Sequence, residues 1–352
     1  MKSRSVLTAV LILISSMAAC GGGSGSTLHM YITNAGSASV SGFSLQSDGS
    51  VGNLTGSPYT SGNTPTALVV APGNFLLEAN AGDNTISRFE IQSGGFLNPF
   101  EGPTNTALTP SSMVINPAGS FVFIANSGSA NISVYSYSAG ALTEISGSPF
   151  PAQTGTAQLA ITPSGNFLYA TNQAASSISG YSIDSTGALT PLAGSPFTTG
   201  VGQLPVGIAV SPSGSFLYAA NRGSNNVSGF SIDSTGNLTP LSNSPFTAGT
   251  APIGVAWDPS SSFLYVVNQS SADVSGFNIA SDGTPTPISG SPWTTGGRGE
   301  SAIAVDPNGD TVVTLNQATN TLTVFTKDSS GVLKAGFPVD TGTAPSGIVI
   351  TK

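Results

Sequence analysis

The chain has 352 residues, of which only 7% are charged, and its 16 acidic and 8 basic residues give a net charge of −8. No cluster of Lys and Arg occurs, so the sequence excludes a nucleic-acid-binding surface, which needs concentrated positive charge. Hydrophobic residues reach 39% and glycine 44 residues. This composition is too apolar for a disordered polymer and is typical of a folded, turn-rich all-β protein.

The first 19 residues have the layout of a secretory signal peptide. Lys2 and Arg4 precede an apolar run at 6–14, which is too short to span a bilayer, and small residues follow it. The tetrad MAAC at 17–20 resembles the bacterial lipoprotein signal, whose cysteine becomes N-terminal and lipidated. Cys20 is the only cysteine, and an unpaired thiol is a liability in an oxidising compartment. We predict export and lipidation of Cys20; the alternative is an ordinary signal peptide with an incidental cysteine.

Residues 20–27 read CGGGSGST and predict a flexible tether between the lipid and a folded body at 28–352. Without Lys2 and Arg4 the chain keeps 6 basic and 16 acidic residues, a net charge of −10. The lipid would be the only contact with the membrane. In a Gram-negative cell, the resemblance to lipoproteins implies the outer membrane, because Gly21 rather than Asp follows the cysteine.

Seven similar segments follow, each ending in asparagine and spaced 46 to 49 residues apart. They end at Asn34, Asn80, Asn126, Asn172, Asn221, Asn268 and Asn316. A complete unit, 205–249, contains four alternating apolar runs separated by turn residues. Four strands in each of seven units predict an all-β, seven-bladed β-propeller with four antiparallel strands per blade. We expect a structural role for the asparagines, which tolerate left-handed backbone and bond to their own turns.

Each unit has a recognisable internal order. The first run, 207–211, alternates small and large residues, as a strand lining a crowded central channel must. After the fourth strand, five units carry Ser-Pro-aromatic, in which proline protects an exposed edge and the aromatic residue can pack between blades. The chain begins at a second strand, 28–34, and ends at 345–352, which matches a first strand. The C-terminal strand should therefore complete blade one and close the ring of a monomer.

The Tyr-x-x-Asn repeat and the strand VSGFSI at 227–232 resemble the YVTN-type and lactonase-type seven-bladed propellers, which are 6-phosphogluconolactonase-like. The resemblance covers residues 28–352. It implies the propeller fold and either lactone hydrolysis or a binding function. The shared motifs are strand and turn residues, so they identify no chemistry by themselves.

Several kinds of catalytic site are excluded by what the sequence lacks. His29 is the only histidine, and it is expected at the end of the ring opposite the loops that follow the repeated asparagines. Six basic residues are too few to converge on a phosphorylated sugar acid, so 6-phosphogluconolactonase activity is set aside. Asp184 and Asp233 begin short hairpin turns rather than calcium loops, and no His/Cys spacing suits a metal. We expect no metal and no other cofactor.

Candidate ligand-binding residues are those at which one unit departs from the others. Gln158 replaces a small residue on the first strand of unit four and should project into the channel. Glu300 stands where five units have proline, and Arg298 lies two residues earlier. Directly after the repeated asparagine, units one to three have Ala or Ser, whereas units four to seven have Gln173, Arg222, Gln269 and Gln317.

These side chains suit hydrogen bonding to a small neutral ligand, a glycan or a protein partner. One alternative is that they are solvated loop tips without a function. The other is a lactone hydrolase, in which Glu300 acts as the base and Arg298 or Arg222 stabilises the oxyanion.

Glu78 and Arg88 replace apolar or small residues found at the matching places of other units. Counting equally from the hairpin centre predicts that they face each other on adjacent strands as an ion pair. The alternative is two independently solvated charges.

Overall fold

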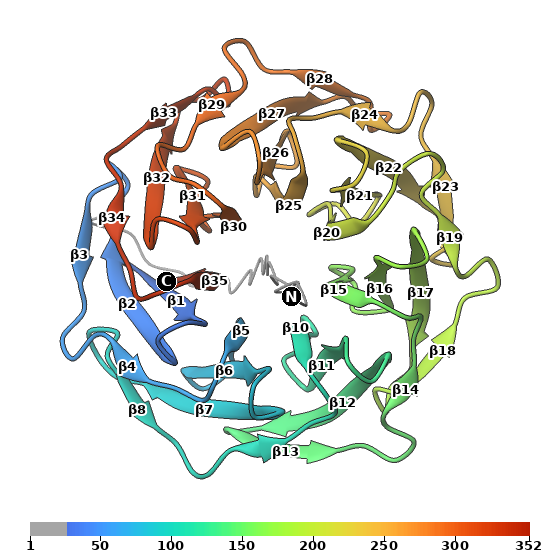
Figure 1. Ribbon diagram of the computed structural model, residues 1–352. Helices are drawn as coiled ribbons and strands as arrows, with labels where there is room; N and C mark the ends of the chain where they lie inside the picture. The colour runs from blue at the N-terminus through green and yellow to red at the C-terminus, as the bar shows by residue number, and fades with distance from the viewer. Residues whose placement is uncertain (1–26) are drawn as a thin grey trace, which may run out of the picture.

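The computed structural model describes residues 27–352. The predicted signal peptide, Cys20 and the tether up to residue 26 lie outside the described residues. The described chain is all β, and its 35 strands form seven sheets arranged as blades around a central axis (Figure 1). The seven-bladed β-propeller predicted from the repeats is confirmed. Among residues 27–352, no helix has the length and apolar character needed to cross a bilayer.

Each blade contains four antiparallel strand positions, and a short fifth strand also pairs with the third. The innermost strands are β5 (Pro65–Ala71), β10 (Pro110–Ile115), β15 (Thr156–Ile161), β20 (Pro205–Val210), β25 (Pro252–Trp257), β30 (Glu300–Val305) and β35 (Pro345–Thr351). The second strands are β1 (Leu28–Asn34), β6 (Phe75–Asn80), β11 (Phe121–Asn126), β16 (Phe167–Asn172), β21 (Phe216–Asn221), β26 (Phe263–Asn268) and β31 (Thr311–Asn316). The third strands are β2 (Ser39–Leu45), β7 (Thr85–Ile91), β12 (Asn131–Ser138), β17 (Ser177–Ile183), β22 (Asn226–Ile232), β27 (Asp273–Ile279) and β32 (Thr321–Lys327).

The outermost strand of every blade is split into two short pieces, which the sequence did not predict. The first pieces are β3 (Val51–Asn53), β8 (Leu97–Pro99), β13 (Ala141–Glu144), β18 (Leu189–Pro191), β23 (Leu238–Pro240), β28 (Pro285–Pro287) and β33 (Leu333–Ala335). The second pieces are β4 (Tyr59–Thr60), β9 (Thr104–Asn105), β14 (Phe150–Pro151), β19 (Phe197–Thr198), β24 (Phe246–Thr247), β29 (Trp293–Thr294) and β34 (Val339–Asp340).

The ring is closed by pairing the two ends of the described chain. Strand β35 lies antiparallel to β1, with Ile350 opposite Met30 and Ile348 opposite Ile32. Blade one therefore combines the first and last strands, as predicted, and Figure 1 shows the C-terminus inside this blade. This pairing leaves no open seam in the ring.

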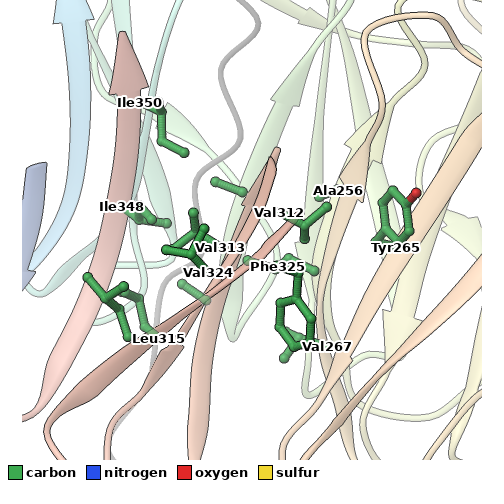
Figure 2. Close-up of a cluster of buried hydrophobic side chains, with 14 of the residues drawn as sticks. Ala256, Tyr265, Val267, Val312, Val313, Leu315, Val324, Phe325, Ile348 and Ile350 are labelled. Atoms are coloured by element: carbon green, nitrogen blue, oxygen red, sulfur yellow. The ribbon is translucent and has the colours of Figure 1, made fainter. Parts of the chain in front are cut away.

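The hydrophobic core lies between neighbouring blades. Figure 2 shows one such cluster, in which Val267 of blade six, Leu315 of blade seven and Ile348 of blade one belong to the same buried group. Tyrosines on the second strands also join blades, because the hydroxyl of Tyr31 donates to the Gly95 carbonyl of blade two at 2.6 Å. Stability is thus shared around the ring rather than confined to each blade.

The innermost strands approach one another closely around the channel. A Cβ atom on Gly207 of β20 would lie 2.6 Å from the carbonyl oxygen of Ile253 on β25. This contact explains why the first run of each repeat alternates small and large residues.

The seven repeated asparagines are fully buried, and their side chains fasten the second strand to the third. Asn126, for example, donates from Nδ2 to Asn131 Oδ1 at 2.9 Å and to Ser133 Oγ at 3.0 Å. Their structural role is confirmed, although none of them adopts the left-handed backbone that asparagine tolerates. Positive φ instead occurs four residues later in each hairpin, as at Ala130.

The Ser-Pro-aromatic segments form the bend between the two outer pieces in five blades, with the Ser-Pro peptide bond in the cis form. The serine hydroxyl accepts from a third-strand amide, as Ser291 Oγ does from Gly276 N at 2.8 Å. The ring of Trp293 lies over Gly276, where a Cβ atom would come within 2.5 Å of it. The aromatic side chain therefore packs on its own blade, and not only between blades as expected.

The predicted ion pair between Glu78 and Arg88 is wrong. Glu78 lies opposite Ser87, while Arg88 lies opposite Leu77, so the two charges are on opposite faces of the sheet. Arg88 instead pairs with Glu101 at 3.0 Å. Glu78 is fully buried, and burial raises the pKa of its carboxyl to about 8.

Candidate functional site

One end of the ring forms a rim where the hairpins between second and third strands meet the connections between blades. In each blade, the residue after the repeated asparagine donates its N–H to the carbonyl of the residue that precedes the innermost strand. Gln173 thus donates to Gly155, just before β15, and Arg222 donates to Leu204, just before β20. This bond recurs in all seven blades. Gln173, Arg222, Gln269 and Gln317 therefore occupy equivalent rim positions in four successive blades.

The rim side chains differ in their exposure to solvent and in their hydrogen bonds to the protein. Arg222 and Arg298 are exposed, and Gln173 and Gln317 are half-buried. Gln269 is also half-buried, but its Nε2 donates to the backbone oxygen of Glu300 at 3.0 Å and so links blade six to blade seven. Within residues 27–352, the side chains of Gln173, Arg222, Arg298 and Gln317 make no hydrogen bond to the protein, so their donors and acceptors remain available to a ligand.

Glu300 begins β30 at the rim, but its side chain turns inward and is fully buried. Its Oε1 accepts a hydrogen bond from Thr295 Oγ1 at 2.5 Å, while Oε2 has no hydrogen-bond partner. Burial raises the pKa of the Glu300 carboxyl, and the nearby charge of Asp273 adds a smaller push in the same direction. Because the carboxyl is fully buried, a ligand resting on the rim does not reach it.

Arg298 and Glu300 are not an ion pair. The two ion pairs of the described chain join Arg88 to Glu101 and Lys327 to Asp258. The backbone of Arg298 is fixed, because its carbonyl accepts from Ala318 N at 3.0 Å, and its side chain extends into solvent. The guanidinium is therefore available to a ligand rather than to the carboxyl beside it.

Gln158 of β15 is almost completely buried, with 1% of its surface exposed. Its Oε1 accepts the N–H of Ile208 on β20 at 3.1 Å. The side chain thus crosses to the innermost strand of the next blade, and its amide oxygen serves the interface between blades four and five.

The connection at residues 199–204, between β19 and β20, contributes rim residues that the sequence analysis missed. It has six residues, compared with four or five in the other connections between blades. Val201 is 72% exposed and Leu204 is 46% exposed. The spacing of 49 residues between Asn172 and Asn221, the longest in the chain, was the signal that could have identified this loop.

The opposite end of the ring carries His29 and most hairpin carboxylates. His29 lies on β1 at the end away from Asn34, as expected, and burial lowers the pKa of its imidazole. Asp184 accepts from Thr186 N at 2.8 Å and from Ala188 N at 3.0 Å, and Asp233 makes the same contacts in its own hairpin. Both aspartates are therefore turn residues, as predicted.

The sequence matches the family model described as "Lactonase, 7-bladed beta-propeller" over residues 24–149, 138–243 and 202–292. The fold is similar to that of the periplasmic gluconolactonase PpgL of Pseudomonas aeruginosa, with a TM-score of 0.79 and 20% identity, over 93% of this chain and 99% of that chain. It is also similar to a candidate 6-phosphogluconolactonase of Bacteroides fragilis, with a TM-score of 0.81 and 20% identity, over 93% of this chain and 98% of that chain. The search of curated proteins found no match.

Proposed function

Because the chain belongs to the lactonase family of seven-bladed β-propellers, we propose that it is an exported, lipid-anchored propeller that binds a small neutral ligand on its rim. A glycan or a segment of a protein partner would use the same contacts. The chain would act as a monomer without a cofactor.

One observation carries this proposal: polar side chains with free hydrogen-bonding groups occupy equivalent rim positions in blades four, five and seven. Gln173, Arg222 and Gln317 replace the Ala35, Ala81 and Ser127 of blades one to three. Amides and guanidinium groups bind carbonyl, hydroxyl and ether oxygens well, and they need no charge on the ligand. The rim thus provides orientation and hydrogen bonds more readily than it provides a nucleophile.

Hydrolysis of a non-phosphorylated lactone is the second candidate. It is favoured by the raised pKa of Glu300 at the same rim as Arg298 and Arg222, and by family membership. Glu300 would activate water, and one of the arginines would stabilise the developing oxyanion. For this, the loop 295–299 would have to expose the carboxyl to the substrate, since Glu300 is fully buried.

Lipid attachment at Cys20 would also orient the rim. Strand β1 starts at Leu28, at the end of the ring opposite the rim, and runs to Asn34 on the rim. A chain tethered ahead of Leu28 would therefore present its rim away from the membrane. This orientation suits the capture of a ligand from the envelope space or the cell exterior.

Binding and hydrolysis can be separated with the mature chain, residues 20–352, carrying Cys20→Ser so that no lipid is attached. Isothermal titration calorimetry against a panel of lactones, neutral oligosaccharides and peptides should show saturable binding. Arg222→Ala should weaken it about tenfold, because a hydrogen bond to a charged group contributes about 1.5–3 kcal/mol. The matched control is Lys334→Ala, which removes an equally exposed cation from the outer strand β33 and should leave binding unchanged.

Lactone turnover is measured by pH-stat titration on the same protein, with and without a chelator. Turnover that Glu300→Gln abolishes would establish the hydrolase and exclude a pure binding role. Saturable binding with no turnover, weakened by Arg222→Ala, would exclude the hydrolase. Glutamine keeps the acceptor for Thr295, so loss of turnover in this variant would reflect the missing acid-base group.

A further inference from the structure

The loop 199–204 places aliphatic side chains among the polar groups of the rim. Val201 and Leu204 are 72% and 46% exposed, and Leu108, on another connection at the same rim, is 57% exposed. These are three of the five large hydrophobic residues that are exposed in the part of the chain the structure describes. Exposed apolar groups gathered at one end of an otherwise polar surface mark a site of interaction.

The base of this loop is fixed to the hairpins of both neighbouring blades. Thr199 Oγ1 donates to the carbonyl oxygens of Ser176 and Gly202 at 2.7 and 2.6 Å. On the other side, Gly223 N donates to the carbonyl oxygen of Gln203 at 2.9 Å. Val201 and Leu204 are therefore held out from an anchored loop, and their exposure does not result from a loose segment.

The apolar and polar groups belong to one surface. The carbonyl of Leu204 accepts from Arg222 N at 3.1 Å. Leu204 also lies against Gly223, where a Cβ atom would be 3.2 Å from Leu204 Cδ1. On the other side, Leu204 N donates to Ser176 Oγ, in the hairpin that Gln173 begins, at 3.4 Å. Leu204 thus lies between the hairpins that Arg222 and Gln173 begin, and Val201 belongs to the same loop.

We infer that the ligand of this rim is a small neutral amphiphile: a lactone or related carbonyl head bound by Arg222 and Gln173, with an alkyl chain that covers Val201 and Leu204. This inference rests on the proposed function and specifies its ligand class. A simple sugar would leave both aliphatic side chains exposed to water. An alkyl chain that packs on them buries its own apolar surface and theirs at the same time. The neutral head agrees with the part of the rim beside the loop 199–204, which offers Arg222 and the amide of Gln173 rather than a cluster of cations.

The test is a series of γ-lactones whose alkyl side chain grows from none to eight carbons, titrated into residues 20–352 carrying Cys20→Ser. Affinity should rise about two- to fourfold for each added methylene until Val201 and Leu204 are covered. The double variant Val201→Thr/Leu204→Thr should flatten this dependence while keeping the affinity for the shortest lactone. Thr64 and Thr109 already occupy the position of Leu204 in other blades with the same positive φ, so threonine fits the backbone there.

Two controls separate this inference from the proposed function. Arg222→Ala should weaken all members of the series by the same factor, because it removes a contact to the head. Phe337→Ser removes an apolar side chain that is 92% exposed outside the rim and should change nothing. Binding that does not depend on chain length, or a dependence that survives the double threonine variant, overturns the amphiphile while leaving rim binding intact. The absence of binding by any lactone overturns both.

Discussion

Lys327 of blade seven reaches across to Asp258 of blade six, with 3.2 Å between Nζ and Oδ2, and both side chains are largely buried. The lysine also lies 5.1 Å from the centre of the Phe263 ring. Other blades have isoleucine at the position of Lys327, as at Ile183, Ile232 and Ile279. The pair therefore replaces an apolar contact with a charged link between blades.

Lys327→Ile should destabilise the protein by about 3 kcal/mol, because it leaves the buried carboxylate of Asp258 without a cation, with Ser260 as its remaining hydrogen-bond donor. Chemical denaturation monitored by fluorescence measures this. The double variant Lys327→Ile/Asp258→Ser, which copies Ile279 of blade six and Ser211 of blade five, should recover most of the loss. A single variant as stable as the parent would show that Asp258 remains solvated.

Stability should fall as pH rises because of Glu78. Its native pKa of about 8 lies above its ordinary value of 4.5, so between these values the native state keeps a proton that the unfolded chain releases. The stability associated with this proton is fully present below pH 4.5 and is lost as pH rises through about 8, at up to about 1.4 kcal/mol per unit.

Glu78→Gln removes this titration. Between pH 5 and pH 8, the unfolding free energy of the parent should therefore fall by roughly 3 kcal/mol relative to that of the variant. Denaturation midpoints at several pH values measure the difference, and Glu90→Gln at an exposed position is the matched control. Parallel pH profiles for Glu78→Gln and the parent would place the carboxyl in contact with water.

The fold was predictable because the same strand and turn pattern recurs seven times, so errors in one unit are corrected by the others. The pairing of Glu78 with Arg88 could not be checked in this way, because it depended on counting residues from the centre of a single hairpin. The hairpin has four residues between Asn80 and Thr85, which places Ser87 opposite Glu78. An error of one residue moves a side chain to the other face of a sheet.

The places of the candidate residues on the ring could be predicted from the sequence, but their burial could not. Comparing the repeats identified Glu300 and Gln158, and both lie on the innermost strands near the rim. Their burial depends on Thr295 and on Ile208 of the next blade, contacts that no pattern within one repeat reveals. Val201 was missed for a different reason, because it lies in the longest connection between blades and the shorter connections offer no counterpart for comparison.

Deleting residues 345–352 should expose the edge of β1 and open the ring. The innermost strand of blade one would be lost, and with it the buried Ile348 and Ile350. We expect aggregation or loss of cooperative unfolding, measured by light scattering and calorimetry. Unchanged melting of the truncated chain would contradict the closing role of β35.

Lipidation is tested in cells with radioactive palmitate. The intact chain should be labelled and should sediment with the membrane fraction, whereas Cys20→Ser should be unlabelled and soluble after export. Persistent labelling of the Cys20→Ser variant would contradict attachment at this cysteine.

Replacing one of the buried asparagines should destabilise the fold, because its side chain makes several hydrogen bonds. Asn126 donates to Asn131 and Ser133, and its Oδ1 accepts from Thr106 Oγ1 at 3.2 Å. Asn126→Ala removes these bonds and leaves the buried hydroxyl of Ser133 without its amide donor, so we expect a loss of about 1–3 kcal/mol in the free energy of unfolding. Asn131→Ser keeps an acceptor for Asn126, as Ser177 does for Asn172 at 3.1 Å in blade four, and should cost much less. Equal destabilisation by the two variants would mean that the alanine acts through packing rather than through lost hydrogen bonds.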